Sequence, residues 1–343
     1  MNSTHTIRVH TTVLKSHIGR TFEFEKKGLA QFAVNVGTKC GHDCVYCSTG
    51  STLRMNQSFK DVGEDPFKTG YAIVDPETPD RVADAAKRIK KRGLVQLCTT
   101  VDAWSPEAQQ YNLGRRCLEA LLSEPGWTVR ILTKNAAVTK EFDLIEQHRD
   151  RVLIGISLTA MPSRADIMSV VEPHASSITD RMAALREACR RGLRVYGMLC
   201  PLLPGIANHP TDIDRLISFC LECGAEEIFA EPVNNRGTGL KILTEVLTES
   251  NYPEEAKAIN EIRVEKKWSA YTTQLLRDIQ SNLRSRGALD KLRFLLYPTS
   301  LTEEDRQAIQ NDDAGVKWLE KEKPPRRGRA RRAVESNVKT GQR

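Results

Sequence analysis

Alternating strand and helix patterns constrain the fold of this chain more than any other feature of its sequence. Six apolar runs of strand length occur in the first two thirds, and each is followed by a segment with the helical spacing of apolar residues. Such units in succession predict a parallel sheet covered by helices. With 40% hydrophobic residues, the 343-residue chain is able to bury a sizeable core. The expected strands are residues 32–36, 94–99, 128–133, 152–158, 194–200 and 227–231.

The segments between these strands have the periodicity of amphipathic helices. In one of them, Ile178, Met182, Leu185 and Cys189 share a single helical face. Glycines mark the expected passages from helix to strand at Gly93, Gly126, Gly192 and Gly224. The expected helices lie at about 79–92, 107–122, 139–149, 178–191, 211–223 and 238–247.

Two stretches depart from this rhythm. Residues 48–77 form a connection much longer than usual, which makes them a candidate lid. Residues after 253 have helical patterns at 254–284 and 303–321, around a short strand at 292–297. We therefore divide the chain into an N-terminal segment, a barrel, a mainly helical extension and a basic disordered tail, at residues 1–30, 31–247, 248–322 and 323–343.

The net charge of +7 is concentrated in one short segment. Residues 323–343 contain eight Lys or Arg and one acidic residue, Glu335, which accounts for the whole excess. This segment suits the phosphate backbone of a nucleic acid, although it has no interleaved aromatic residues for base stacking. A solvated end without function is the alternative. The remaining residues are balanced in charge, so charge indicates nothing about what the folded part binds.

Membrane and secretory signals are not found in the sequence. No run approaches the roughly 18 apolar residues of a spanning helix, and the first residues lack the apolar segment of a secretory signal. We therefore expect a soluble, cytoplasmic protein without a membrane partner.

Three closely spaced cysteines follow the first expected strand. Cys40, Cys44 and Cys47 have the spacing Cys-x3-Cys-x2-Cys. Three thiolates are able to hold three irons of a 4Fe-4S cluster, which leaves the fourth iron open to a small-molecule ligand. The alternative is a zinc site or a set of reduced core thiols. A zinc site normally requires a fourth ligand, and no second Cys or His pair with suitable spacing accompanies the motif.

The motif, with the aromatic Tyr46 directly before its third cysteine, resembles the signature of the radical S-adenosylmethionine (SAM) superfamily. The resemblance implies a partial (β/α)6 TIM-type barrel, with the motif in the loop after the first strand. It also implies that a 4Fe-4S cluster receives an electron from a reductant such as flavodoxin or ferredoxin. The cluster then cleaves SAM to a 5′-deoxyadenosyl radical that abstracts hydrogen from a substrate. Tyr46 would lie against the SAM adenine.

Further motifs resemble the spore photoproduct lyase-like branch, which includes DNA-repair enzymes. The resemblance covers residues 31–235 and implies that Lys134 and Ser157 contact SAM, with Thr100 as a third contact. Damaged pyrimidines would then be the substrate. The branch-like stretches are Gly41-His42-Asp43, Leu132 to Asn135, Ile156 to Thr159, Glu172-Pro173, Arg181 and Cys200 to Gly205.

Two further residues near the second strand have competing interpretations. By resemblance, Cys98 is a hydrogen donor to a substrate radical, whereas free cysteines usually behave as small apolar core residues. Asp102 either binds the SAM amine or caps the helix that starts near Glu107. The lyase-like branch often has Asp-Pro-Tyr here, and this chain has Asp102-Ala-Trp104 instead, which leaves the substrate open.

The other cysteines are expected to pack in the core. Cys220 and Cys223 form a Cys-x2-Cys pair, but they lie in a helical pattern and have no partner pair nearby. Cys117, Cys189 and Cys200 are interpreted in the same way. Two other functions stay open: a non-catalytic iron-sulfur protein that binds nucleic acid, and a radical SAM enzyme acting on RNA, a peptide or a small molecule.

Overall fold

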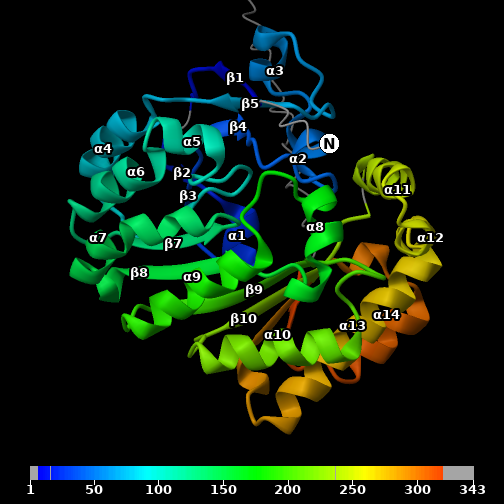
Figure 1. Ribbon diagram of the computed structural model, residues 1–343. Coiled ribbons are helices and arrows are strands. Elements are labelled where there is room, and N and C mark those ends of the chain that lie inside the picture. The colour runs from blue at the N-terminus through cyan, green and yellow to red at the C-terminus, as the bar shows by residue number, and fades with distance from the viewer. Residues whose placement is uncertain (1–6, 16, 236, 320–343) are drawn as a thin grey trace, which may run out of the picture.

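The computed structural model describes residues 7–15, 17–235 and 237–319 of the chain (Figure 1). Its main feature is a nine-stranded sheet with the order β12-β11-β10-β9-β8-β7-β6-β3-β2, parallel except for the pairing of β2 with β3. Six of its strands are those expected from the apolar runs, so the predicted partial barrel is confirmed. They are β3 (Phe32–Val34), β6 (Leu94–Leu97), β7 (Thr128–Thr133), β8 (Val152–Ser157), β9 (Val195–Leu202) and β10 (Ile228–Pro232).

The register of this sheet brings the ends of distant strands together. Thr133 on β7 pairs with Ile156 on β8, and Ser157 on β8 pairs with Met198 on β9. Because the strands are parallel, their carboxyl ends meet at one edge, which is where barrels of this kind place their functional loops.

The sheet extends beyond the six expected units. β11 (Leu292–Leu296) pairs in parallel with β10, and β12 (Val316–Trp318) pairs in parallel with β11. The predicted helix at 303–321 is therefore wrong for residues 311–319, because α14 (Glu303–Gln310) ends at Gln310, and the last two residues of the predicted helix lie outside the described part of the chain. At the other side, the short β2 (Gly19–Arg20) covers the edge of β3.

A second, three-stranded sheet lies beside the barrel. It has the order β1-β5-β4 and consists of β1 (Arg8–Thr11), β5 (Tyr71–Val74) and β4 (Gly37–Lys39). Residues 48–77 were expected to be a loop, but they contain β5 and two short helices, α2 (Thr49–Leu53) and α3 (Gln57–Val62). Phe59, Tyr71 and Ile73 form a small apolar cluster of their own, so this insertion is a folded unit.

Helices cover the outer face of the sheet and bury the larger apolar cluster against it. The expected helix at 107–122 is two helices, because Asn112 between them has the left-handed φ of 52°. The helices after β5 are α4 (Thr78–Arg88), α5 (Pro106–Gln110), α6 (Leu113–Leu122), α7 (Phe142–Gln147), α8 (Ala165–Val171), α9 (Ile178–Arg190), α10 (Pro210–Glu222), α11 (Gly239–Glu249), α12 (Pro253–Glu261) and α13 (Glu265–Ser285). Short 3-10 turns are η1 (Ala136–Glu141), η2 (Arg149–Arg151), η3 (Pro162–Arg164), η4 (Leu289–Lys291) and η5 (Pro298–Ser300).

Glycine is required at helix ends where the chain turns toward the next strand. Gly192 after α9 and Gly224 after α10 have φ values of 67° and 72°, a region that other residues rarely adopt. Both were expected from their positions in the sequence.

The inner face of the curved sheet is filled by a separate apolar cluster. Phe24 and Leu29, in and just after α1 (Phe22–Lys26), pack there with Phe229 and Leu295. The first helix therefore lies within the curve of the sheet instead of outside it (Figure 1). Tyr196 also belongs to this cluster, and its ring covers Gly155 so closely that a Cβ there would lie 2.1 Å from the ring Cζ.

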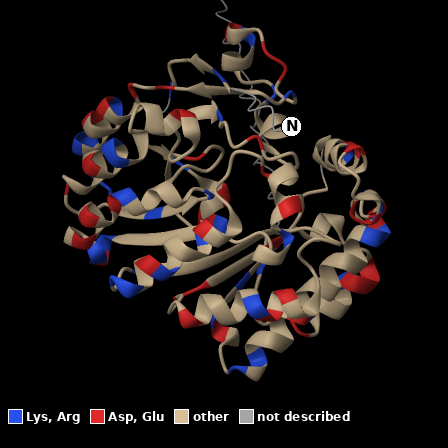
Figure 2. Ribbon diagram, in the orientation of Figure 1, with Lys and Arg blue, Asp and Glu red and all other residues tan. Residues whose placement is uncertain are grey.

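Charged residues of both signs are interspersed over the outer helices (Figure 2), as expected for a body whose charges balance. Within the described residues, no helix is long and apolar enough to cross a membrane.

Candidate active site

The three motif cysteines line one cavity beside the carboxyl end of the parallel strands. Cys40 and Cys44 are half-buried, Cys47 is exposed, and all three are free thiols. The cavity has a volume of about 600 Å³, including space open to solvent, and Thr100 from the end of β6 also lines it. Three thiols on the wall of one cavity are a donor set that fits an iron-sulfur cluster.

The environment of Cys40 and Cys44 opposes the ionisation of their two thiols. Burial, followed by the negative charges of Glu107 and the neighbouring cysteines, raises the pKa of Cys40. Burial and then Glu172 raise the pKa of Cys44 to about 12. A metal that binds here must therefore displace protons from the thiols.

Side chains from α5 hold the start of the cysteine loop. The Gly41 amide donates to Glu107 Oε2 at 3.0 Å, and Ser105 Oγ donates to Glu107 Oε1 at 2.6 Å. A Cβ at position 41 would lie 2.6 Å from Glu107 Oε2, so glycine permits this close approach. Burial raises the pKa of Glu107 to about 7.

The centre of the loop is held by His42 and Asp43, both buried. His42 Nδ1 lies 3.5 Å from Asp102 Oδ2, and its Nε2 lies 3.5 Å from the Asn135 amide nitrogen. Burial lowers the pKa of His42. Asp43, with a left-handed φ of 52°, accepts a hydrogen bond of 2.5 Å from the Gly70 amide of the folded insertion. The loop is thus tied to both the barrel and the smaller sheet.

Asp102 joins the ends of β6 and β7. Its carboxylate accepts hydrogen bonds from the Thr133 hydroxyl at 2.8 Å, from the Lys134 amide at 2.8 Å and from the Trp104 amide at 2.9 Å. The expectation that Asp102 caps the next helix is wrong, because the N-cap residue of α5 is Ser105. Both carboxylate oxygens of Asp102 accept hydrogen bonds from the protein, and one of these comes from the backbone amide of Lys134.

Asn35, just after β3, fixes the position of Thr100. Its Oδ1 accepts hydrogen bonds from the Thr100 amide at 3.1 Å and from the Thr100 hydroxyl at 3.2 Å. The Thr100 carbonyl in turn accepts from the Thr49 hydroxyl at 2.8 Å, which brings α2 to the same cavity wall.

Tyr46 and Lys134 lie together over a buried ion pair. The Tyr46 hydroxyl donates a short hydrogen bond to Glu172, and Lys134 Nζ lies 5.9 Å from the centre of the Tyr46 ring. Arg181 donates to the same Glu172. Burial alone would lower the pKa of Lys134, but the charges of Glu172 and Cys44 outweigh it and raise that pKa. Lys134 is therefore a cation next to the cysteine loop.

Ser157 lies at the carboxyl end of β8 and is buried. Its carbonyl accepts a hydrogen bond of 3.2 Å from Arg181, which connects this strand end to the ion pair below Tyr46. Arg181 and Glu172 thus connect Ser157 to Tyr46, and Lys134 lies beside the Tyr46 ring.

A second polar group lies on the inner face of the barrel. The Cys200 thiol lies 3.6 Å from Glu231 Oε2, and Lys27 Nζ lies 3.4 Å from both carboxylate oxygens of Glu231. Glu231 also lines a cavity of about 310 Å³ with Trp268 and Tyr297. Cys200 was expected only to pack, but its thiol takes part in this polar group.

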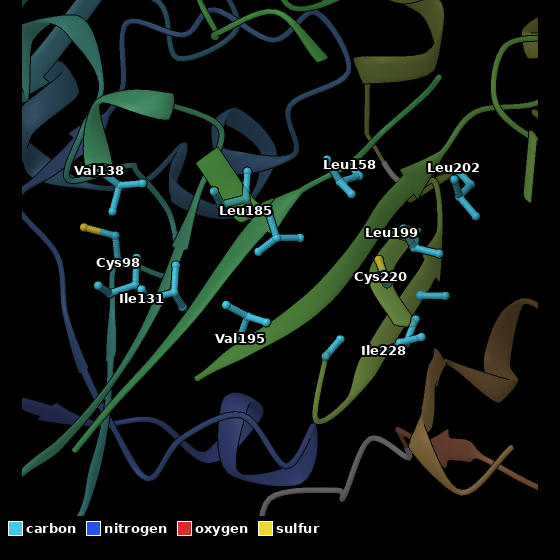
Figure 3. Packing of buried hydrophobic residues seen from close by; sticks show 14 of the residues in the cluster. Cys98, Ile131, Val138, Leu158, Leu185, Val195, Leu199, Leu202, Cys220 and Ile228 are labelled. Carbon is cyan, nitrogen blue, oxygen red and sulfur yellow. The ribbon is translucent and has the colours of Figure 1, made fainter. Parts of the chain in front are cut away.

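Cys98 lies away from the cysteine loop cavity, in the outer core. Its side chain is 3% exposed and belongs to the same buried cluster as Ile131 and Val138 (Figure 3). Burial raises the pKa of its thiol. Its backbone has a left-handed φ of 65°, which turns the chain at the end of β6. These contacts are those of a packing residue, and the hydrogen-donor role stays a prediction.

The remaining cysteines mostly behave as the sequence indicates. Cys117, Cys220 and Cys223 are buried in the outer core, and the half-buried Cys189 packs against it. In the part of the chain that the structure describes, no three His, Cys, Asp or Glu side chains converge closely enough to hold a single metal ion.

Sequence reasoning missed several residues that build the site. Glu107 holds the cysteine loop at Gly41 and Asn35 holds Thr100, and Lys27 reaches Glu231 across 204 positions of sequence. Glu172 and Arg181 were noted only as parts of a family-like pattern. The available signals were that Glu172 directly follows two valines and that Arg181 falls on the apolar face of its helix, since buried charges are normally paired.

Known proteins resemble this chain in both sequence and fold. Residues 34–217 match the family described as the radical SAM superfamily. An uncharacterised protein of Acidianus two-tailed virus is 25% identical over 64% of this chain and 72% of its own length. An uncharacterised protein of Methanocaldococcus jannaschii is 24% identical over 52% of this chain and 63% of its own, so the chain spans less than two thirds of that relative.

Among solved structures, spore photoproduct lyase complexed with dinucleoside spore photoproduct has a TM-score of 0.55 at 15% identity. The match covers 81% of this chain and 79% of that one. A lyase variant with bound AdoMet and the same dinucleoside has a TM-score of 0.52 at 14% identity, with 80% and 85% covered. The fold is therefore that of the lyase. Because the family match covers more than half of the sequence, this chain belongs to the radical SAM superfamily of enzymes.

Proposed function

We propose that this protein is a SAM-cleaving radical enzyme in which Cys40, Cys44 and Cys47 hold a 4Fe-4S cluster. The observation that carries the proposal is the meeting of all three thiols on one cavity wall, in a chain of this superfamily. When bound, the cluster and SAM together supply a 5′-deoxyadenosyl radical that abstracts hydrogen from a substrate.

The residues around the cavity have distinct tasks in this proposal. The Lys134 ammonium binds the carboxylate of the SAM methionine, since a cation suits that group. Thr100 and Ser157 offer polar contacts to the same ligand, and the Tyr46 ring lies against its adenine. Asp102 holds the Lys134 amide and the Thr133 hydroxyl, so it orients this strand end. If Asp102 also binds the SAM amine, its carboxylate does so in addition to its three donors within the protein, the Thr133 hydroxyl and the amides of Lys134 and Trp104.

The substrate that we propose is a damaged base in a nucleic acid. Two similarities support this choice: the fold is shared with a lyase whose solved structure contains dinucleoside spore photoproduct, and residues 323–343 carry eight basic side chains. The proposed electron donor is a flavodoxin or ferredoxin. Residues 323–343 lie outside the described part of the chain.

The test is anaerobic reconstitution with iron and sulfide, followed by dithionite and SAM. We expect the wild-type protein to hold about four irons per chain, as a 4Fe-4S cluster requires, and to release 5′-deoxyadenosine. Cys44→Ala is expected to lose both properties. Cys220→Ala is the matched control, since Cys220 is a buried core thiol remote from the motif, and it should retain them. A wild-type protein that holds the cluster but never cleaves SAM would contradict the proposal.

A further inference from the structure

Glu172 and Arg181 form a buried ion pair that contacts the cysteine loop. Glu172 follows α8 and Arg181 lies in α9, and their side chains are 1% and 2% exposed. Glu172 accepts hydrogen bonds from Tyr46 Oη, from Thr159 Oγ1 at 3.2 Å and from Arg181. Tyr46 is separated from Glu172 by 126 positions, so the pair connects two distant parts of the chain.

Arg181 is fixed by neighbours other than Glu172. Its Nε donates to the Ser176 carbonyl at 2.7 Å, and its Nη1 donates to the Ser157 carbonyl at 3.2 Å and to Thr159 Oγ1 at 3.4 Å. The guanidinium therefore has a defined orientation, and it presents Nη2 to Glu172. The end of β8 and the start of α9 set the place of the carboxylate.

The charge states of these groups are consistent with a fixed direction of hydrogen bonding. Burial alone would raise the pKa of Glu172, but the charges of Arg181 and Lys134 outweigh it and lower that pKa. Glu172 is therefore an ionised carboxylate, and the Tyr46 hydroxyl donates a hydrogen bond to it.

Burying an ion pair contributes little net stability, because desolvation of both charges offsets their attraction. A pair of this kind is better explained by the geometry that it imposes. Here the same segment makes two more contacts with the cysteine loop: the Val45 amide donates to the Val171 carbonyl at 3.0 Å, and the His174 amide donates to the His42 carbonyl at 3.3 Å.

We propose that Glu172, held by Arg181, is a positioning residue that sets Tyr46 and Lys134 for SAM binding. This inference rests on the proposed function. The carboxylate fixes the Tyr46 ring through its hydroxyl and keeps the Lys134 ammonium beside that ring. Neither Glu172 nor Arg181 needs to touch SAM, because both act through Tyr46 and Lys134.

The first test measures SAM affinity of the reconstituted protein by equilibrium dialysis, without turnover. Glu172→Gln is expected to keep its iron and to raise the dissociation constant of SAM about tenfold, because the hydrogen bond from Tyr46 loses its charged acceptor. Tyr46→Phe should raise it by a similar factor. The double variant should bind SAM more tightly than the product of the two single effects predicts, since both changes act on the same contact.

Glu227→Gln is the matched control. Glu227 bonds the buried Arg130 at 3.0 Å on the inner face of the barrel, at the opposite ends of the strands. This change also removes the charge from an Arg–Glu pair, in which Arg130 is buried and Glu227 is half-buried, but it should leave SAM affinity unchanged. Equal weakening by Glu227→Gln and Glu172→Gln would overturn the inference, and so would multiplied effects in the double variant.

A second measurement needs neither cluster nor SAM. In the metal-free protein, Tyr46→Phe should lower the urea midpoint of unfolding less in the Glu172→Gln background than in the wild-type background, because the uncharged amide of glutamine is a weaker acceptor. Equal shifts of the urea midpoint in both backgrounds would show that Tyr46 and Glu172 do not interact. If the wild-type protein binds no SAM, the proposed function fails, while this cycle still decides whether Glu172 positions Tyr46. Thr159→Val, which removes one donor to Glu172, replaces Glu172→Gln if that variant does not fold.

Discussion

At the scale of single residues, Cys98 shows how burial competes with a chemical role. Its thiol lies in the outer core with Ile131 and Val138, whereas the motif thiols line an open cavity. A hydrogen donor must reach the substrate radical, whereas a packing residue only fills space. Removal of the sulfur therefore has different consequences for a donor and for a packing residue.

Cys98→Ala is expected to leave SAM cleavage intact and to change the distribution of substrate-derived products, because a donor acts after the radical has formed. Both can be measured by chromatography of anaerobic reactions. Cys117→Ala is the control, since Cys117 is a fully buried thiol of the same cluster and should alter neither quantity. A normal product formed at the normal rate by Cys98→Ala would show that this residue only packs.

The sequence predicts candidate ligands better than it predicts their supports. Cys40, Cys44 and Cys47 are recognisable because they are close in sequence and their spacing is characteristic. The contact of Tyr46 with Glu172 and that of Lys27 with Glu231 join positions 126 and 204 residues apart. Local spacing contains no information about such pairs, because only the folded sheet brings them together.

At the scale of elements, periodicity predicts the barrel strands well. The strand β7 has the expected bounds, and β8 ends one residue before its expected end. The failures are short elements whose partners are remote. The four-residue β5 lies between β1 and β4 in the small sheet, and it was mistaken for loop because a short run in a polar stretch has little periodicity.

The contact of Gly155 on β8 with the Tyr196 ring on β9 allows a prediction about the packing of these two strands. Gly155→Ala would place a Cβ 2.1 Å from the Tyr196 ring, below Ser157 on the same strand. Overpacking of this kind should lower the free energy of unfolding by roughly 1–3 kcal/mol, measurable by urea denaturation. In a Tyr196→Leu background, the same substitution should cost less, because the ring is absent. Equal costs in both backgrounds would show that the ring is not the obstacle.

At the scale of the whole molecule, the excess positive charge lies in residues 323–343, and the charges of the rest of the sequence balance. Both signs are interspersed over the outer helices, and eight basic residues lie within 323–343. The general electrostatic attraction of the protein for a nucleic acid would therefore come mainly from residues 323–343.

Replacing the eight basic residues of 323–343 by Gln keeps the length of the chain and removes their charge. We expect weaker binding of a single-stranded oligonucleotide and a smaller dependence on salt. For each phosphate that the protein no longer neutralises, the slope of log K against log salt should flatten by roughly 0.7. Fluorescence anisotropy across a salt series measures both. An unchanged slope would place the binding on the folded body, and SAM cleavage serves as the control that the body is intact.

The anchors of the cysteine loop also have a consequence for when the proposed cluster could be loaded. The thiols belong to residues 40–47, yet the loop is shaped by bonds to Gly70, Glu107, Asn135 and the 171–174 segment. During synthesis the thiols therefore leave the ribosome well before the residues that shape their loop. For the cluster proposed above, we therefore expect metal loading to be a late step of maturation, performed on a chain that has already folded most of its barrel.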